Sequence, residues 1–201
     1  MPKLKNWLTH ENVMIRAVTL WFTCFALLAV TSFVSYYFLP YSILRGVFPS
    51  ANLPLGNDFL SAFLTIFLFN LVVGCGLTVA LNLLSAKSIP LGYFYPLIQI
   101  SLYGVFLGTD SFAISHGSRL FPSITLVNGA GFYEFTAYVL VATATARLVL
   151  WNQTGWLGGS LIKIKERKEL KLSRSELFTV TLGVLLLLVA AAIEANGIMG
   201  T

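Results

Sequence analysis

Five long apolar stretches, separated by short polar or charged connections, account for most of the chain. They are Ala17–Leu39, Phe59–Leu84, Leu91–Leu107, Phe121–Leu150 and Leu177–Ile198. A transmembrane helix needs about 20 consecutive apolar residues, and none of the stretches alternates like a strand of a membrane barrel. Because a single span satisfies its backbone in lipid only as a helix, the pattern predicts an all-α bundle with five transmembrane helices. We expect residues 1–201 to form a single integral membrane domain.

The fourth stretch is too long for one span, because roughly 30 residues reach about 45 Å and the bilayer core measures about 30 Å. Gly129 and Gly131 predict a helix break inside it. We expect Phe121–Asn128 to be a short re-entrant or interfacial piece, followed by a spanning helix from about Gly131 to Leu150. The first stretch exceeds the roughly 7–15 apolar residues of a signal peptide, so we expect it to be retained.

Lysine and arginine are distributed unevenly over the connections. Two of them, Arg45 and Arg119, fall on one side of the five predicted spans. The rest fall on the other side: Lys3, Lys5, Arg16, Lys87, Arg147, Lys163, Lys165, Arg167, Lys168, Lys171 and Arg174. Cytoplasmic loops carry the excess of positive residues, so the N-terminus is predicted to be cytoplasmic and the C-terminus outside.

The composition excludes a soluble domain. Hydrophobic residues make up 57% of the chain and charged residues only 10%, whereas soluble domains carry roughly 45–50% and about 25%. The net charge of +5 follows from the membrane orientation, so we expect no nucleic-acid partner. Cys24 and Cys75 both fall inside apolar stretches, which gives no disulfide framework.

Residues 151–176 form a basic cytoplasmic segment that is expected to lie at the membrane interface. Its cations can meet anionic lipid headgroups while apolar neighbours such as Leu161 and Ile162 dip inward. These cations are Lys163, Lys165, Arg167, Lys168, Lys171 and Arg174. The alternative is a docking site for a cytosolic partner.

Four polar residues fall inside the predicted spans: Glu134, Glu194, Asn70 and Gln99. An ionised group at mid-membrane costs at least ~2.5–3.5 kcal/mol, so these positions are the informative ones. The two glutamates are expected near the outer face, at similar depth. They are either structural hydrogen-bonding groups, partner-binding or conformational elements, or part of a proton- or ion-handling site.

Small residues mark close helix approaches. Gly74, Gly76, Gly104 and Gly108 are interpreted as helix-packing positions. The last two form a GxxxG pattern that could instead pair two copies of the chain as a homodimer.

The sequence carries no enzymatic or cofactor motif: HExxH, GxSxG, a Walker lysine and CxxC are all absent. Asp110, His116 and the glutamates lack the spacing of metal ligands. We therefore expect neither an enzyme nor a bound cofactor or metal.

Two segments resemble a known family. Ala130–Ala137 resembles the signature of the stage II sporulation protein M family, which reads His-Gly, two apolar residues, then Glu-Leu-Pro-Ala. Ala190–Asn196 resembles that family's last helix, in which Ile-Glu recurs, and the region around Asn70 resembles its asparagine-and-glycine helix. Ala130 replaces the family's histidine and Thr136 its proline, so no role of that histidine transfers.

The resemblance implies a prokaryotic, multi-pass plasma-membrane protein that acts as a scaffold, because the sporulation member is a membrane partner of cell-wall hydrolases. We therefore expect a non-enzymatic interaction subunit that contacts membrane lipids and other membrane or extracytoplasmic proteins. The alternative function is a small transporter or permease-like subunit, in which Glu134 and Glu194 line a polar path with Asn70 and Gln99.

Overall fold

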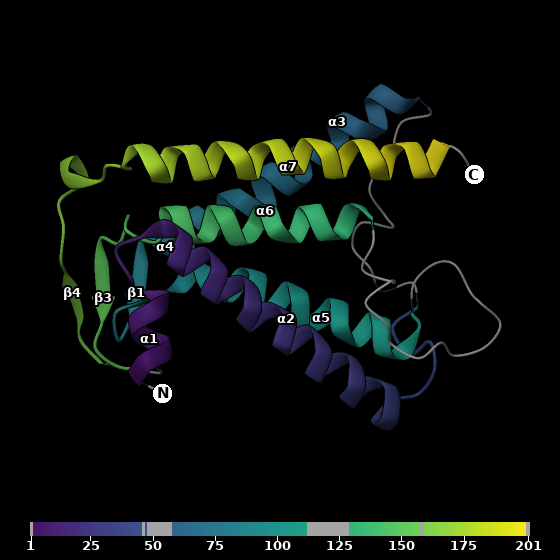
Figure 1. The fold of residues 1–201 in the computed structure, drawn as a ribbon, viewed down its shortest axis with the longest axis horizontal. Coiled ribbons are helices and arrows are strands. Elements are labelled where there is room, and N and C mark those ends of the chain that lie inside the picture. Colours follow the sequence, from purple (N-terminus) through teal and green to yellow (C-terminus); the bar gives the residue numbers. More distant parts are fainter. Residues whose placement is uncertain (1, 46, 48–57, 112–128, 157–158, 200–201) are drawn as a thin grey trace.

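The computed structural model describes residues 2–45, 47, 58–111, 129–156 and 159–199, and most of them are helical (Figure 1). The α-helices are α1 (Pro2–Leu8), α2 (Val13–Phe38), α3 (Phe59–Phe69), α4 (Leu77–Asn82), α5 (Phe94–Thr109), α6 (Ala130–Thr145) and α7 (Arg174–Met199). A π-helix, η2 (Asn70–Gly76), joins α3 to α4, and the described residues also form two 3-10 turns, η3 (Leu91–Tyr93) and η5 (Arg167–Glu169).

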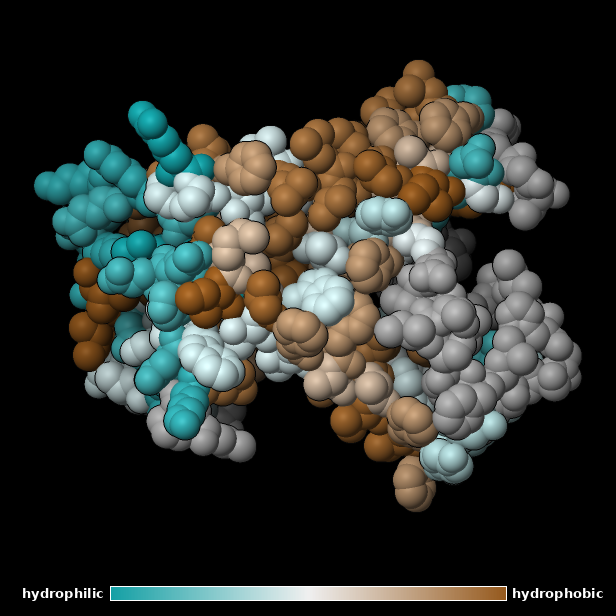
Figure 2. All heavy atoms as spheres, in the orientation of Figure 1, coloured by the Kyte–Doolittle hydropathy of each residue, from teal (hydrophilic) through white to brown (hydrophobic). Residues whose placement is uncertain are grey.

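Four helical segments are long and apolar enough to cross a membrane: Val13–Phe38, Phe59–Asn82, Leu91–Thr109 and Arg174–Ile198. Their outer faces expose large apolar side chains, such as Phe22 and Phe178. Figure 2 shows these brown surfaces over the helices and hydrophilic residues gathered at one end. Since water does not solvate such a surface well, these helices indicate a membrane protein.

A four-stranded sheet, which the sequence analysis did not predict, occupies the hydrophilic end of the bundle (Figure 1). Its strands are β1 (Leu84–Ala86), β2 (Ile89–Pro90), β3 (Trp151–Gln153) and β4 (Leu161–Lys163), in the order β2-β1-β3-β4. β1 pairs with β3 in parallel, and the two outer pairings are antiparallel. The sheet thus ties the connection after α4 to the connection after α6.

The sheet also explains why two helices end before their apolar stretches do. α4 ends at Asn82, whereas the second apolar stretch continues to Leu84, and α6 ends at Thr145, whereas the fourth stretch continues to Leu150. The N–H groups of Leu150 and Trp151 both donate to the carbonyl oxygen of Leu83, at 2.8 and 3.1 Å. The apolar residues after α6 therefore connect the helix to the sheet and do not extend the helix.

The predicted break before the fourth span lies at Gly129, whose φ of +137° favours glycine and which directly precedes α6. Gly131 lies inside α6, against the Tyr103 ring. The predicted re-entrant piece Phe121–Asn128 lies outside the described residues, as does His116.

α6 lies at the centre of the bundle and packs against α2, α4, α5 and α7. Its residues Val139, Ala142 and Ala144 are fully or almost fully buried. Small residues also allow α2 and α5 to approach closely: a Cβ at Gly104 would overlap Thr31, and one at Gly108 would overlap the backbone of Ser32.

Two expectations about glycines need correction. The face that carries Gly104 and Gly108 is covered by α2, so that face is not free to pair two copies of the chain. Gly76 is exposed, and the nearest atom to a Cβ there would be the Leu71 carbonyl oxygen of its own helix, at 3.8 Å. Within the described part of the chain, no other helix therefore packs closely against Gly76, whereas Gly74 faces Tyr138 of α6.

Candidate functional site

Glu134 forms a hydrogen-bonded pair with Tyr138 one turn further along α6. The Tyr138 hydroxyl donates to Glu134 Oε1 at 2.7 Å, and the tyrosine ring is buried. The ring fits because residue 74 has no side chain: a Cβ at Gly74 would overlap it. Gly74 lies in η2, and π-helical turns inside α-helices are frequent at functional sites.

Tyr95 and Gln99 of α5 extend this polar pair toward the outside of the bundle. The rings of Tyr95 and Tyr138 meet edge to face, with centroids 5.2 Å apart. The Gln99 amide donates to the Tyr95 hydroxyl at 3.1 Å, and Gln99 itself is exposed on the flank of the helix. A polar track therefore leads from the helix flank to Glu134.

The other two predicted polar residues are Glu194 and Asn70. Glu134 lies in the second turn of α6, and Glu194 lies near the end of α7. Both lie at the end of the bundle opposite the sheet, where α6 begins and α7 ends (Figure 1). Asn70 is buried and begins η2, four residues before Gly74. The arrangement can hold and position a proton between an acid and a phenol.

A second polar group, centred on Arg16, fastens the sheet end of the bundle. The Arg16 side chain is 2% exposed, and its Nη2 lies 2.8 Å from Glu176 Oε1. Its Nε donates to the Thr143 carbonyl oxygen at 3.1 Å, and its Nη1 donates to the carbonyl oxygens of His10 and Glu11. One guanidinium thus joins the start of α2 to the end of α6 and the start of α7.

Glu176 is held from both sides. Its Oε2 accepts the backbone N–H and the hydroxyl of Ser173, both at 2.9 Å, so the carboxylate also caps the first turn of α7. Buried ion pairs need such additional hydrogen bonds to offset the cost of removing two charges from water. This geometry makes the Arg16–Glu176 pair a structural clamp.

Asn82, at the end of α4, is a third polar junction and is fully buried. Its amide nitrogen donates to the Ala142 carbonyl oxygen at 2.8 Å and to Thr145 Oγ1 at 2.7 Å. Its amide oxygen accepts the Gly92 N–H at 3.0 Å. Asn82 therefore joins α4, α6 and η3.

The basic segment is not one continuous surface helix. It contains β4 and η5, separated by extended chain, and Leu161, Ile162 and Ile164 are 56%, 49% and 50% exposed. Two of its cations contact protein groups: Lys163 pairs with Glu166, and Lys165 donates to a backbone carbonyl. The other four predicted lipid-facing cations, Arg167, Lys168, Lys171 and Arg174, are exposed.

The sequence analysis missed Tyr138, Tyr95 and the Arg16–Glu176 pair. Tyr138 follows Glu134 by four residues and Gln99 follows Tyr95 by four, so the i, i+4 rule for helix neighbours could have found both hydrogen bonds. The Arg16–Glu176 contact spans 160 positions, and no local pattern signals it. Of the protein families, curated proteins and solved structures compared with this chain, none matches it.

Proposed function

We propose that the chain crosses a prokaryotic plasma membrane five times, with α6 as the fourth crossing in chain order, in addition to the four long apolar helices. The parallel pairing of β1 and β3 supports this topology, because it holds the connections after α4 and after α6 at the same end. α5 leads away from the sheet and α6 leads back to it (Figure 1). If α5 crosses the membrane, α6 must cross as well.

The short length of α6 is compatible with this topology. Its 16 residues reach about 24 Å, less than the roughly 30 Å of the bilayer core. Since α6 is surrounded by other helices, it contacts protein rather than lipid along most of its length. Irregular backbone at its ends is tolerated at membrane depth where protein covers it.

In the proposed orientation, the sheet and the N-terminus lie in the cytoplasm and the end of α7 lies outside. The Tyr93 hydroxyl donates to the Leu8 carbonyl oxygen at 2.8 Å, which holds the N-terminal segment at the sheet end. The positive residues of the N-terminus, the β1–β2 turn and the basic segment all belong to that end. This distribution is the one that the positive-inside rule associates with the cytoplasmic face.

The function that the geometry supports best is that of a non-enzymatic scaffold, or interaction subunit, that positions partner proteins at the membrane. One observation carries the proposal: buried polar groups join helices of this same chain, Arg16 to α6 and α7 and Asn82 to α6 and η3. Buried hydrogen bonds between helices fix the helices relative to one another, which is what a scaffold for other proteins requires. The similarity of the segments around Glu134 and Glu194 to stage II sporulation protein M also supports a scaffold.

The test is extraction of the tagged chain in a mild detergent, followed by affinity purification and native mass spectrometry. A stoichiometric partner protein in the eluate supports the scaffold. Replacing Leu161 and Ile162 with serine tests whether the exposed β4 surface binds it, and Trp7→Ser is the control, since Trp7 is a similarly exposed apolar residue of α1. A chain recovered only as a monomer or homodimer contradicts an obligate scaffold.

A transport function is the second candidate, and the track from Gln99 through the two tyrosines to Glu134 favours it. The proposal predicts that Glu134→Gln abolishes proton or substrate flux in proteoliposomes while the protein still folds. Gln99→Leu shortens the track at its exposed end and should reduce the flux. Equal flux in the parent chain, in both variants and in empty liposomes contradicts transport.

A further inference from the structure

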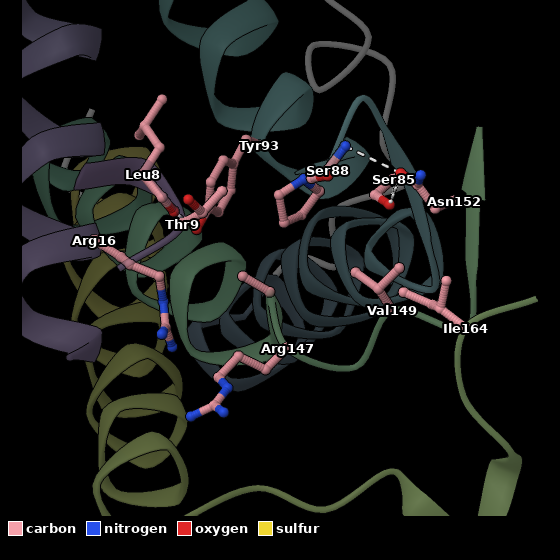
Figure 3. A pocket seen from close by; sticks show the side chains of 12 residues that line it. Leu8, Thr9, Arg16, Ser85, Ser88, Tyr93, Arg147, Val149, Asn152 and Ile164 are labelled. Carbon is pink, nitrogen blue, oxygen red and sulfur yellow. Dashed lines mark hydrogen bonds between the residues drawn. The ribbon is translucent and has the colours of Figure 1, made fainter. Parts of the chain in front are cut away.

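A cavity of about 210 Å³ opens at the sheet end, between the N-terminal segment, the β1–β2 hairpin and the end of α6 (Figure 3). Arg16 and Arg147 lie on one side of it, and Ser85, Ser88 and Asn152 lie on the other. At ~30 Å³ per water molecule, the cavity has room for roughly seven waters. That space is sufficient for a phosphate group together with part of its ester substituents.

The cavity is positively charged. The charge of Arg16 is balanced by Glu176, at 2.8 Å. Arg147 is exposed and, among the residues that the structure describes, forms no ion pair with a carboxylate. An anion entering here meets positive charge that no described acidic group neutralises.

The opposite wall supplies neutral hydrogen-bond donors on a fixed backbone. Asn152 Oδ1 accepts the Ser85 hydroxyl at 2.8 Å and the Ser88 N–H at 3.0 Å. These bonds fix the amide, and within the described chain its Nδ2 group and the Ser88 hydroxyl have no protein acceptor. Both can therefore donate to the oxygens of a bound anion.

We propose that this cavity binds the phosphate group of an anionic phospholipid from the cytoplasmic leaflet. The cavity lies where α2, α5 and α6 meet the polar end of the molecule, and apolar Leu8, Val149 and Ile164 line it beside the polar groups. Basic pockets between transmembrane helices on the cytoplasmic side bind headgroups of this kind. The proposal rests on the proposed membrane orientation, with the sheet end in the cytoplasm, but it does not require a protein partner.

Two matched pairs of variants test the site without disturbing the core. Arg147→Gln removes the cation of the cavity that has no carboxylate partner among the described residues, and Arg174→Gln removes a cation at the same end that lines no part of the cavity. Ser88→Asp places a carboxylate at the cavity, and Ser88→Asn places a neutral group of the same size there. Ser88 has φ +69°, a conformation that both aspartate and asparagine tolerate, and it is exposed.

The experiment titrates the purified full-length chain in detergent with short-chain phosphatidylglycerol, short-chain phosphatidylcholine or inorganic phosphate, with binding followed by native mass spectrometry. Phosphatidylglycerol should bind most tightly. Its affinity should fall at least about ten-fold in Arg147→Gln and in Ser88→Asp, the loss expected for a charge-assisted hydrogen bond. Arg174→Gln should bind it like the parent chain, and Ser88→Asn, which replaces the hydroxyl donor with an amide donor, should lose less affinity than Ser88→Asp.

Three results would overturn the proposal. Equal affinity for phosphatidylglycerol in all four variants would mean that the cavity is not the site. An equal loss in Arg174→Gln would mean that the charge of the whole end, and not the cavity, attracts the lipid. Inorganic phosphate that binds as tightly as phosphatidylglycerol, and is lost in the same variants, would identify a free anion and not a lipid as the occupant.

Discussion

Removing the guanidinium of Arg16 should destabilise the protein more than any change at the exposed cations. Arg16→Met keeps much of the apolar stem but leaves Glu176 Oε1 without its cationic partner at a side chain only 3% exposed. Three carbonyl oxygens, of His10, Glu11 and Thr143, lose a donor as well. Breaking one partner of a buried ion pair costs about 3–5 kcal/mol, because the other charge stays buried and uncompensated.

In a chain of this size each 1 kcal/mol lowers Tm by roughly 2–4 °C, so Arg16→Met should lower it by about 6–20 °C. Circular dichroism of the detergent-solubilised protein measures this shift. Arg174→Met is the control, since Arg174 is exposed at the first residue of α7. The double variant Arg16→Met/Glu176→Gln should lose roughly 0.5–3 kcal/mol less than the sum of the single variants, because the residues are in contact. A Tm shift for Arg16→Met no larger than that for Arg174→Met would refute the clamp.

Two further predictions concern the packing of the bundle, each measured as a change in the free energy of unfolding in detergent. Gly74→Ala should cost about 1–3 kcal/mol, because its Cβ would overlap the Tyr138 ring. Gly76→Ala, whose Cβ would meet nothing closer than 3.8 Å, should be neutral or slightly stabilising. Equal effects at both glycines would show that Tyr138 does not fill the space at residue 74. Asn82→Leu should cost about 1–3 kcal/mol, because it leaves the Gly92 N–H buried without an acceptor. Gln99→Leu, at an exposed site, should cost less than about 0.5 kcal/mol. An Asn82→Leu variant as stable as the parent would mean that the hydrogen bonds of Asn82 do not stabilise the bundle.

The helices could be predicted from the sequence because long apolar stretches leave the backbone few alternatives in lipid. The break at Gly129 was also predictable, since glycine readily adopts the positive φ observed there. The capping residues Asn12 and Asp58, which accept backbone N–H groups at the starts of α2 and α3, follow the same local rules.

The sheet was not predictable by the same means. Its strands are two or three residues long, too short for an alternating pattern to be recognised. The β1–β2 turn has positive φ at Lys87 and Ser88, which turns of this kind usually achieve with asparagine and glycine. β1 and β3 pair across more than 60 residues, so their contact depends on the path of α5 and α6 and on no local signal.

The candidate site was found only in part. Glu134 and Glu194 could be identified because a carboxylate inside an apolar stretch is conspicuous. Tyr138 and Arg16 were not identified, since a tyrosine is common in membrane helices and Arg16 was interpreted as an orientation signal at the start of the first span. Their roles depend on which helix lies opposite, as Gly74 does for Tyr138.

Cysteine accessibility tests the five-crossing topology most directly. The native Cys24 and Cys75 are buried, so introduced cysteines supply the signal. Gly197→Cys lies near the end of α7 with open space around its Cβ, and Lys168→Cys is exposed at the sheet end. Five crossings predict that a membrane-impermeant maleimide labels Gly197→Cys in intact cells and labels Lys168→Cys only after the cells are permeabilised. Labelling Lys168→Cys in intact cells would contradict a cytoplasmic sheet, and protection of Gly197→Cys until permeabilisation would contradict an outward end of α7.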